Sequence, residues 1–378
     1  MATTPPGHIK IKFEKFKNLK ISINIKNFYE MEDKQHKLDN QNKSIKNFLA
    51  QYKPKIKENL VVSIFFLLLI LFILLNFSDI KKVLNLIYKA NWLFLSIALL
   101  CVFLHIFSFS LHLRDVLKKA GEKANVWFLT KIAIAMTFVD TVLPSQRIGG
   151  HIFLFKSLRK KEIVKEKRSL VFFISGIANF TVDFIIFLIA TIYTVIFIKS
   201  NVVKILLLAM TGIFFILYVP IAPFFFSSKG EKYVIGFFRK LPKKWLDKII
   251  KDFSKRAEGV FKGYYKEKKR LKPRDWFMPL LFMLFNRIFL YLTLFFSVLS
   301  LNYYISIDKV LIAEILSMGI AFFSFVKIGF FEGALALALT GLSIDYNVAL
   351  TSTLIFRFLS FWLPTLIGYL FFRQMMKR

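Results

Sequence analysis

Four charged residues stand inside long apolar segments and are the first candidates for chemistry: Asp183, Arg287, Glu314 and Arg357. A charge inside hydrocarbon is costly, so such a side chain normally faces protein or a water-filled cavity. The two acids and two arginines therefore either pair with one another for structure or line a path for an anionic or zwitterionic head group. The residue types leave both interpretations open.

The motif LPSQRIGGH (143–151) follows an apolar segment. Pro144, Gly149 and Gly150 should break a helix there. Arg147 offers several hydrogen-bond donors to a phosphate. The plainer interpretation is a turn that carries a basic residue.

A second motif, FVKIGFFEGAL (325–335), has the same character. Gly329 and Gly333 let backbone approach backbone or ligand, and Glu332 needs a partner if it is buried. The plainer interpretation is a loop in which Lys327 neutralises Glu332.

The sequence thus predicts three groups of site residues, and no catalytic residue, metal site or cofactor. Candidate ligands of a lipid head group are Arg147, Arg287 and Arg357. Candidates for ion coupling or charge pairing are Asp183, Glu314 and Glu332. Candidate hinge or turn residues are Pro144, Gly149, Gly150, Gly329, Gly333, Pro364 and Gly368.

The composition indicates a membrane protein. Of the 378 residues, 56% are hydrophobic and 47 are Phe, and the charged residues gather between the apolar runs. A net charge of +32 would suggest nucleic-acid binding in a soluble protein. Because Lys and Arg flank apolar spans here, we expect them to face anionic lipid on the cytoplasmic side, with no nucleic-acid partner. The predicted location is the cell membrane, with several passes.

The elements that must position the candidate residues are about six full transmembrane helices and two re-entrant hairpins, in an all-α polytopic protein. Lys and Arg number 13 in 1–59, 13 in 113–168 and 16 in 230–275, but three in 78–91 and one in 302–309. The basic segments and both termini should therefore be cytoplasmic. A full crossing by 125–143 would place basic residues outside, so we expect hairpins over 125–158 and 310–342; the alternative is eight complete spans. The six spans are 60–77, 92–112, 169–198, 203–226, 276–301 and 347–372.

The integral membrane domain (60–372) divides into two halves, 60–198 and 203–372, with the same order of elements in opposite orientation. This pattern is typical of an inverted repeat, which places a binding site near the midplane between the halves. Residues 1–59 should form a basic, mostly disordered cytoplasmic tail. Residues 231–272 should form a basic amphipathic insert on the cytoplasmic leaflet.

The segment FVKIGFFEGALALALTGLSIDYNVALTSTLIFRFLSFWLPTLIGYL resembles the C-terminal signature of the lysylphosphatidylglycerol synthase transmembrane-region family, which is similar to the flippase half of the multiple peptide resistance factor. In that signature a glycine turn and an acid precede a span with arginine, proline and glycine. DTVLPSQRIGGHIFLFK is similar to the family's proline–glycine–acid segment, with Gly150 where an acid is usual and Phe153 in place of an arginine. Asp183 fits a glutamate–arginine–x–x–aspartate pattern in which Asn179 and Phe180 replace the charged pair. The residues that fit the C-terminal signature are Gly329, Glu332, Gly333, Arg357, Pro364 and Gly368.

The resemblance implies a protein that handles polar-headed lipids, anionic or zwitterionic, with flipping or transport as the leading function. No ATP-binding motif is present, so active transport would use an ion gradient. Aminoacylation belongs in that family to a separate soluble domain, and we do not expect it here. One alternative is a polytopic glycosyltransferase using a polyprenyl-phosphate sugar, although Asp79 is the one acid in 78–91. The other is a non-catalytic scaffold whose charges pair for structure.

Overall fold

The computed structural model describes residues 85–142, 148–198, 200–226, 230, 253–323 and 329–377. Within these ranges the chain forms helices joined by short turns and contains no β-strand, and the protein is an all-α polytopic membrane protein. The predicted tail 1–59, the predicted span 60–77 and residues 231–252 of the predicted insert lie outside the described residues.

Long apolar helices form the frame of the described part. They are α4 (Trp92–Lys119), α7 (Lys165–Phe197), α8 (Asn201–Phe226) and α12 (Phe277–Leu299), which follows the 3-10 turn η2 (Pro273–Trp276). A last stretch consists of α15 (Tyr346–Arg357), η3 (Phe358–Trp362) and α16 (Leu363–Lys377). The stretches long and apolar enough to cross a membrane are Trp92–Lys119, Lys165–Phe197, Pro273–Leu299 and Tyr346–Met376.

Two pairs of shorter helices lie among the long ones. α5 (Val126–Val142) contacts α6 (Ile148–Arg159), and α13 (Ile307–Phe323) contacts α14 (Phe330–Gly341). Each pair has a helix of 17 residues followed by one of 12 residues. A 12-residue helix is about 18 Å long, which is too short for a hydrocarbon core of about 30 Å. The lengths therefore favour two hairpins over eight complete spans.

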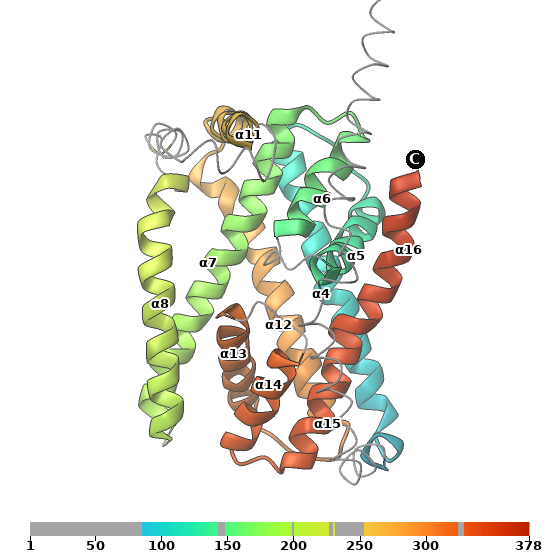
Figure 1. Cartoon of the computed structure of the whole chain (residues 1–378), viewed down its shortest axis with the longest axis vertical. Helices are drawn as coiled ribbons and strands as arrows, with labels where there is room; N and C mark the ends of the chain where they lie inside the picture. The colour runs from blue at the N-terminus through green and yellow to red at the C-terminus, as the bar shows by residue number, and fades with distance from the viewer. Residues whose placement is uncertain are drawn as a thin grey trace, which may run out of the picture. The chain divides into compact units, whose positions relative to one another are not determined.

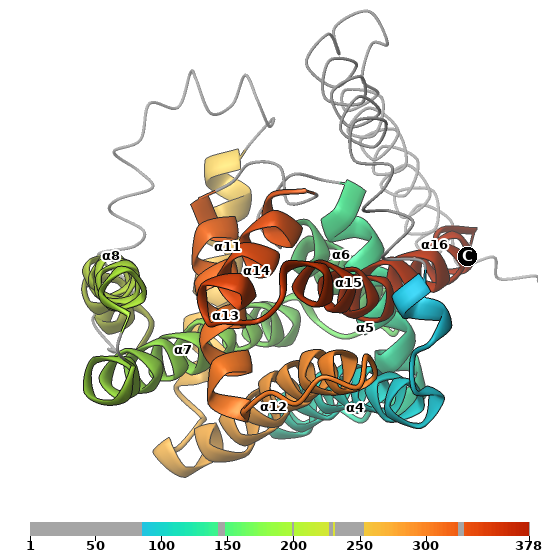
Figure 2. The same cartoon turned by 90° about the horizontal axis from the view of Figure 1, so that it is seen from below.

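A long helix, a short pair and another long stretch follow one another twice, in opposite directions. In Figure 1, α5 and α6 lie in the upper half and α13 and α14 in the lower half, while α4 and α12 pack side by side. Figure 2 shows the same pair from below, with α8 at the edge beside α7. This is the order expected of an inverted repeat, and the boundaries of the two halves stay a prediction.

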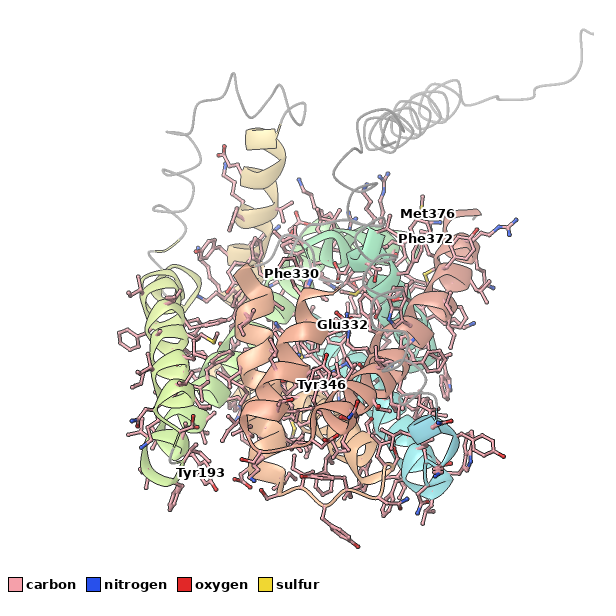
Figure 3. All side chains as sticks on the ribbon, turned by 60° about the horizontal axis from the view of Figure 1, so that its bottom comes forward. Tyr193, Phe330, Glu332, Tyr346, Phe372 and Met376 are labelled. Carbon is pink, nitrogen blue, oxygen red and sulfur yellow. The ribbon has the colours of Figure 1, made fainter. Side chains whose placement is uncertain are left out.

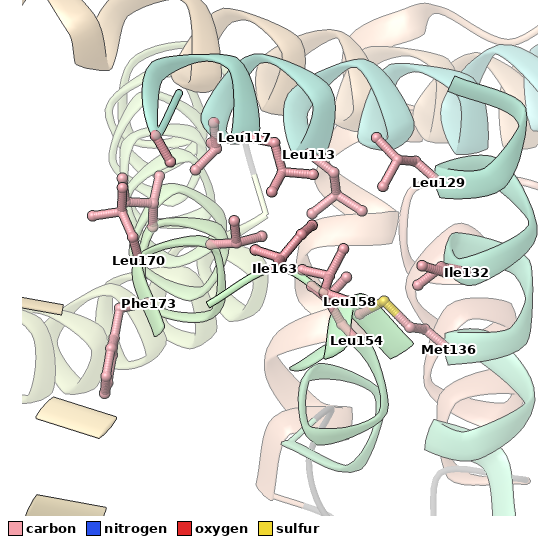
Figure 4. Close-up of a cluster of buried hydrophobic side chains, with 14 of the residues drawn as sticks. Leu113, Leu117, Leu129, Ile132, Met136, Leu154, Leu158, Ile163, Leu170 and Phe173 are labelled. Atoms are coloured by element: carbon pink, nitrogen blue, oxygen red, sulfur yellow. The ribbon is translucent and has the colours of Figure 1, made fainter. Parts of the chain in front are cut away.

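Two apolar clusters hold the helices together. In the first, Leu113, Leu154 and Leu170 are buried between α4, α6 and α7 (Figure 4). In the second, Val310 and Leu335 are buried between α13, α14 and their neighbours. Each cluster belongs mainly to one half, because the hairpin of each half packs against its own flanking helices.

The described part of the predicted insert is α11 (Phe253–Lys268), which packs on α7. Tyr264 and Tyr265 are buried there, and the ring centroids of Phe173 and Tyr264 lie 4.9 Å apart. Partial burial beside these rings lowers the pKa of Lys268 to about 8. The apolar face of α11 is thus covered by protein rather than by lipid alone. In Figure 1, α11, α6 and the C-terminus lie at the same end of the helices, and the side of the membrane stays a prediction.

Candidate functional site

A cavity lined by residues of α4 to α8 and of α12 to η3 brings the intramembrane charges together. Its volume is about 670 Å³, within the range of about 300–1,000 Å³ usual for small-molecule sites. Asp183, Arg287, Glu314 and Arg357 all line it, and none of the four is more than 9% exposed. The wall is otherwise largely apolar, with further polar groups from His105, Thr137, Asp140, His151, Asn179, Tyr218, Asn286 and Ser360.

Arg287 of α12 and Asp183 of α7 form a two-pronged ion pair. Nε of Arg287 donates to Oδ1 of Asp183 at 2.6 Å, and Nη2 donates to Oδ2 at 2.7 Å. Nη2 also donates to Oδ1 of Asn179 at 2.7 Å. Two parallel bonds fix the guanidinium plane, so Arg287 is largely committed to α7. Asp183 and Arg287 are therefore paired with each other, which is the structural interpretation that the sequence had left open.

Arg357, the last residue of α15, pairs with Glu332 in the first turn of α14, not with Glu314. Nε donates to Oε1 of Glu332 at 2.6 Å, and Oε2 accepts the backbone N–H of Gly329 at 2.8 Å; Figure 3 labels Glu332 at the start of this helix. The guanidinium carbon lies 3.9 Å from the ring centre of Phe361, a cation–π contact. Within the part of the chain that the structure describes, Nη1 and Nη2 of Arg357 make no hydrogen bond.

A π turn, η3, follows Arg357 directly. In a regular α-helix the ring of Pro364 would collide with the carbonyl of Ser360, and Pro364 has no N–H to donate. The wider π turn accommodates this conflict. It also brings Ser360 and Phe361 to the cavity wall beside Arg357. Pro364 thus acts by distorting the last span near the site.

Several residues predicted as turns lie in helices instead. Gly149 and Gly150 belong to the first turn of α6, and Gly333 belongs to the first turn of α14. Gly329 does lie at the turn before α14, with a φ of +87° that favours glycine. Gly368 lies inside α16, where an added Cβ would collide with a backbone carbonyl of α5. Gly368 is therefore a close packing position between α16 and α5, and its role as a hinge stays a prediction.

Asp140 is a site residue that the sequence analysis missed. It stands near the end of α5, and its Oδ1 accepts the N–H of Gly150 at 2.7 Å. This N–H is at the N-terminus of α6, where the helix dipole favours a carboxylate. The family pattern has an acid at the position of Gly150, and here the carboxylate reaches in from α5. The available signal was an acid in an apolar segment just before the LPSQRIGGH motif.

Replacing Gly150 with Ala should lower the free energy of unfolding by about 1–3 kcal/mol, the usual cost of leaving a buried polar group unsatisfied. The new Cβ would lie 2.5 Å from Oδ2 of Asp140 and displace that carboxylate. Unfolding of the purified protein in detergent measures the change. Gly212→Ala on α8 is the matched control, because nothing lies within 4 Å of an added Cβ there. Equal stability of Gly150→Ala and wild type would contradict this account.

Further polar contacts join the halves at the cavity wall. Nδ2 of Asn286 on α12 donates to the carbonyl of His105 on α4 at 2.7 Å, and Nδ1 of His105 lies 2.7 Å from the carbonyl oxygen of Asn286. Pro144, Arg147 and Lys327 lie outside the described residues, so the role of Arg147 stays a prediction. Among the described residues, no three His, Cys, Asp or Glu side chains converge as metal ligands would.

Comparisons with known proteins cover most of the chain. A sequence model described as "Lysylphosphatidylglycerol synthase TM region" matches residues 60–368. The chain is also 23% identical over 326 residues to the UPF0104 membrane protein MJ1595 of Methanocaldococcus jannaschii, a match that covers 84% of this chain and 95% of that protein. The matched range includes the described helices from α4 to the middle of α16.

Proposed function

Because the chain belongs to the lysylphosphatidylglycerol synthase transmembrane-region family, we propose that it moves polar-headed lipids between the leaflets of the membrane. In this proposal the head group enters the central cavity, while the acyl chains stay in the bilayer. The cavity size and the charges on its wall support a polar ligand of this kind.

The observation that carries the proposal is the geometry of Arg357. Glu332 holds its Nε and Phe361 covers one face of the guanidinium, so the side chain is positioned before any ligand arrives. The two terminal nitrogens are left for a ligand in the cavity, and a planar pair of donors fits a phosphate. A scaffold whose charges serve only to pair with one another would have no use for such donors.

The two hairpins offer a way to expose the cavity to each side in turn. Ile148, the first residue of α6, and Phe331, in the first turn of α14, both line the cavity. In Figure 1, α6 lies toward one end of the helices and α14 toward the other, so the two hairpins reach the cavity from opposite ends. Movement of one hairpin at a time would open one entrance while the other stays closed, as in transporters built from inverted repeats.

The proposal is tested by lipid translocation in proteoliposomes. Purified protein is reconstituted with lipids that carry a fluorescent acyl chain and a native head group, either anionic or zwitterionic. We expect movement faster than in empty liposomes for at least one head group. Arg270→Gln, a change at an exposed residue just after α11 and away from the cavity, should move lipid as the wild type does. Folded protein that moves no lipid under any gradient would overturn the proposal.

A further inference from the structure

Arg357 of α15 is contacted by two neighbouring residues of another helix, α14. Glu332 accepts a hydrogen bond from Nε of Arg357 at 2.6 Å. The ring centre of Phe331 lies 4.8 Å from the guanidinium carbon, which adds a second cation–π contact to that of Phe361. The ring of Phe331 also stacks on that of Phe356, with 6.3 Å between the ring centres. The first turn of α14 thus contacts the end of α15 through both of these residues.

The placement of Phe331 and Glu332 depends on the turn that begins α14. Gly329 starts this turn with a φ of +87°, a conformation that favours glycine. Oε2 of Glu332 accepts the N–H of Gly329 at 2.8 Å, and the carbonyl of Gly329 accepts the N–H of Gly333 at 2.9 Å. The turn and the carboxylate that binds Arg357 therefore form one hydrogen-bonded unit. A displacement of this unit would carry both Phe331 and Glu332 away from Arg357.

The first hairpin contacts the last span at other residues. The ring centre of Phe138 on α5 lies 5.4 Å from that of Tyr369 and 5.3 Å from that of Phe372, both on α16. The hydroxyl oxygens of Thr141 and Thr365 lie 3.2 Å apart. None of these residues belongs to the described lining of the cavity. These contacts lie along α16, whereas those of the second hairpin reach the guanidinium that a head group would bind.

An arginine binds a phosphate more tightly when its guanidinium is already oriented. A long, mobile side chain that must become ordered during binding weakens the binding by about 2- to 10-fold. While Phe331 and Glu332 contact the guanidinium of Arg357, this ordering has taken place before the ligand arrives. Once the first turn of α14 moves away, the ligand itself has to order Arg357, and the affinity falls.

We propose, building on the proposed function, that the second hairpin switches the affinity of the cavity for the phosphate of a lipid head group. When the first turn of α14 is seated, that is, in contact with Arg357, Phe331 and Glu332 orient the terminal nitrogens and the head group binds tightly. Phe331 is a positioning residue in this switch. Movement of the hairpin opens the cavity and weakens phosphate binding in the same step, so the head group is released when its exit opens. Because coupling between two equilibria is reciprocal, a bound head group must in turn stabilise the seated turn.

The test measures binding and backbone hydrogen exchange of the whole protein in detergent. The probes are dihexanoyl-phosphatidylglycerol and dihexanoylglycerol, which has the same acyl chains and no phosphate. We expect saturating phospholipid to slow exchange in the first turn of α14 by about 2- to 10-fold and to leave the first turn of α6 unchanged. Dihexanoylglycerol should slow neither. Inorganic phosphate is the third probe, and slowing as large as that by the phospholipid would overturn the lipid as the ligand.

Variants of Phe331 test the positioning role. Phe331→Leu should weaken phospholipid binding by about 2- to 10-fold and reduce the slowing of exchange in α14, because no ring orients the guanidinium. Phe331→Tyr keeps the ring and should keep both properties. The matched control is Phe138→Leu, which removes an aromatic contact between the first hairpin and α16 away from the cavity. It should keep the wild-type affinity and the wild-type slowing, even if it lowers stability.

Different outcomes overturn the switch and the transport. If the wild type binds no phospholipid in detergent, or binds it without slower exchange in α14, the switch is overturned and lipid movement in proteoliposomes is unaffected. Equal slowing in α6 and α14 also overturns it. Wild-type binding by Phe331→Leu overturns the role of Phe331. Folded protein that moves no lipid in proteoliposomes overturns the proposed function, whatever the exchange shows. If Phe331→Leu does not fold, the exchange of the wild type and of Phe331→Tyr decides the question.

Discussion

Replacing Arg357 with Gln should slow lipid movement by at least about thirtyfold, since losing one charged partner of a buried contact costs about 2–5 kcal/mol. The two terminal nitrogens of Arg357 are the donors that the structure leaves for a phosphate, and a Gln side chain supplies neither their charge nor their planar fork. Arg357→Lys keeps the positive charge but not the planar pair of donors, so we expect a smaller loss of rate than for Arg357→Gln. Initial rates in proteoliposomes measure both effects.

The Arg357→Gln variant also leaves Glu332 without its cation, so its folding has to be separated from its function. The double variant Arg357→Gln/Glu332→Gln replaces the ion pair with two neutral amides that are able to bond to each other. It should recover stability in a detergent unfolding assay, because no uncompensated carboxylate remains. Its lipid movement should stay low. Wild-type rates in the double variant would show that the charge of Arg357 is not used for transport.

Replacing Arg287 with Met should lower the free energy of unfolding by about 3–5 kcal/mol, because it leaves the carboxylate of Asp183 buried without its cation. Both side chains of the pair are at most 6% exposed. The double variant Arg287→Met/Asp183→Leu should recover most of this loss, since an apolar pair of similar volume removes the buried charge altogether. Thermal and denaturant unfolding in detergent measure the single and double variants.

A more exposed ion pair provides the comparison for Arg287→Met. Nζ of Lys262 lies 2.9 Å from Oε1 of Glu258 on α11, and the two side chains are 55% and 23% exposed. Lys262→Met also replaces a cation with an apolar side chain and should cost less than about 1 kcal/mol, as is usual for surface pairs. Equal losses for Lys262→Met and Arg287→Met would mean that burial does not set the strength of the Asp183–Arg287 pair.

The acidic side chains around the cavity stabilise it through two kinds of contact. Asp183 and Arg287 join α7 to α12 at the cavity wall. At each hairpin a carboxylate satisfies a backbone N–H near the start of the short helix, from Asp140 in the first half and from Glu332 in the second. Both hairpins thus contain the same kind of hydrogen bond, from a backbone N–H to a carboxylate. The acid belongs to the preceding helix α5 in one hairpin and to the short helix α14 itself in the other.

The sequence by itself determined that this is an all-α membrane protein with several long apolar helices. It favoured two hairpins among them and left eight complete spans open. Hydrophobicity is a property of each segment alone. Runs of apolar residues, and the Lys and Arg between them, can therefore be recognised in the sequence without any knowledge of packing. For the same reason, a charge in an apolar segment could be recognised as a site residue. The family resemblance over 60–372 was legible too, and the match over residues 60–368 confirms it.

Only the tertiary structure decided which of these charges meet. Asp183 and Arg287 are 104 positions apart, and the sequence did not indicate that Arg357 pairs with Glu332 and not with Glu314. Such choices depend on the rotation and depth of each helix, which many weak packing contacts set together. Gly150 illustrates the same limit, since the sequence shows a missing acid there and the fold supplies the carboxylate of Asp140 from another helix. Apolar character is local to a segment, whereas the partner of a buried charge is a property of the assembled helices.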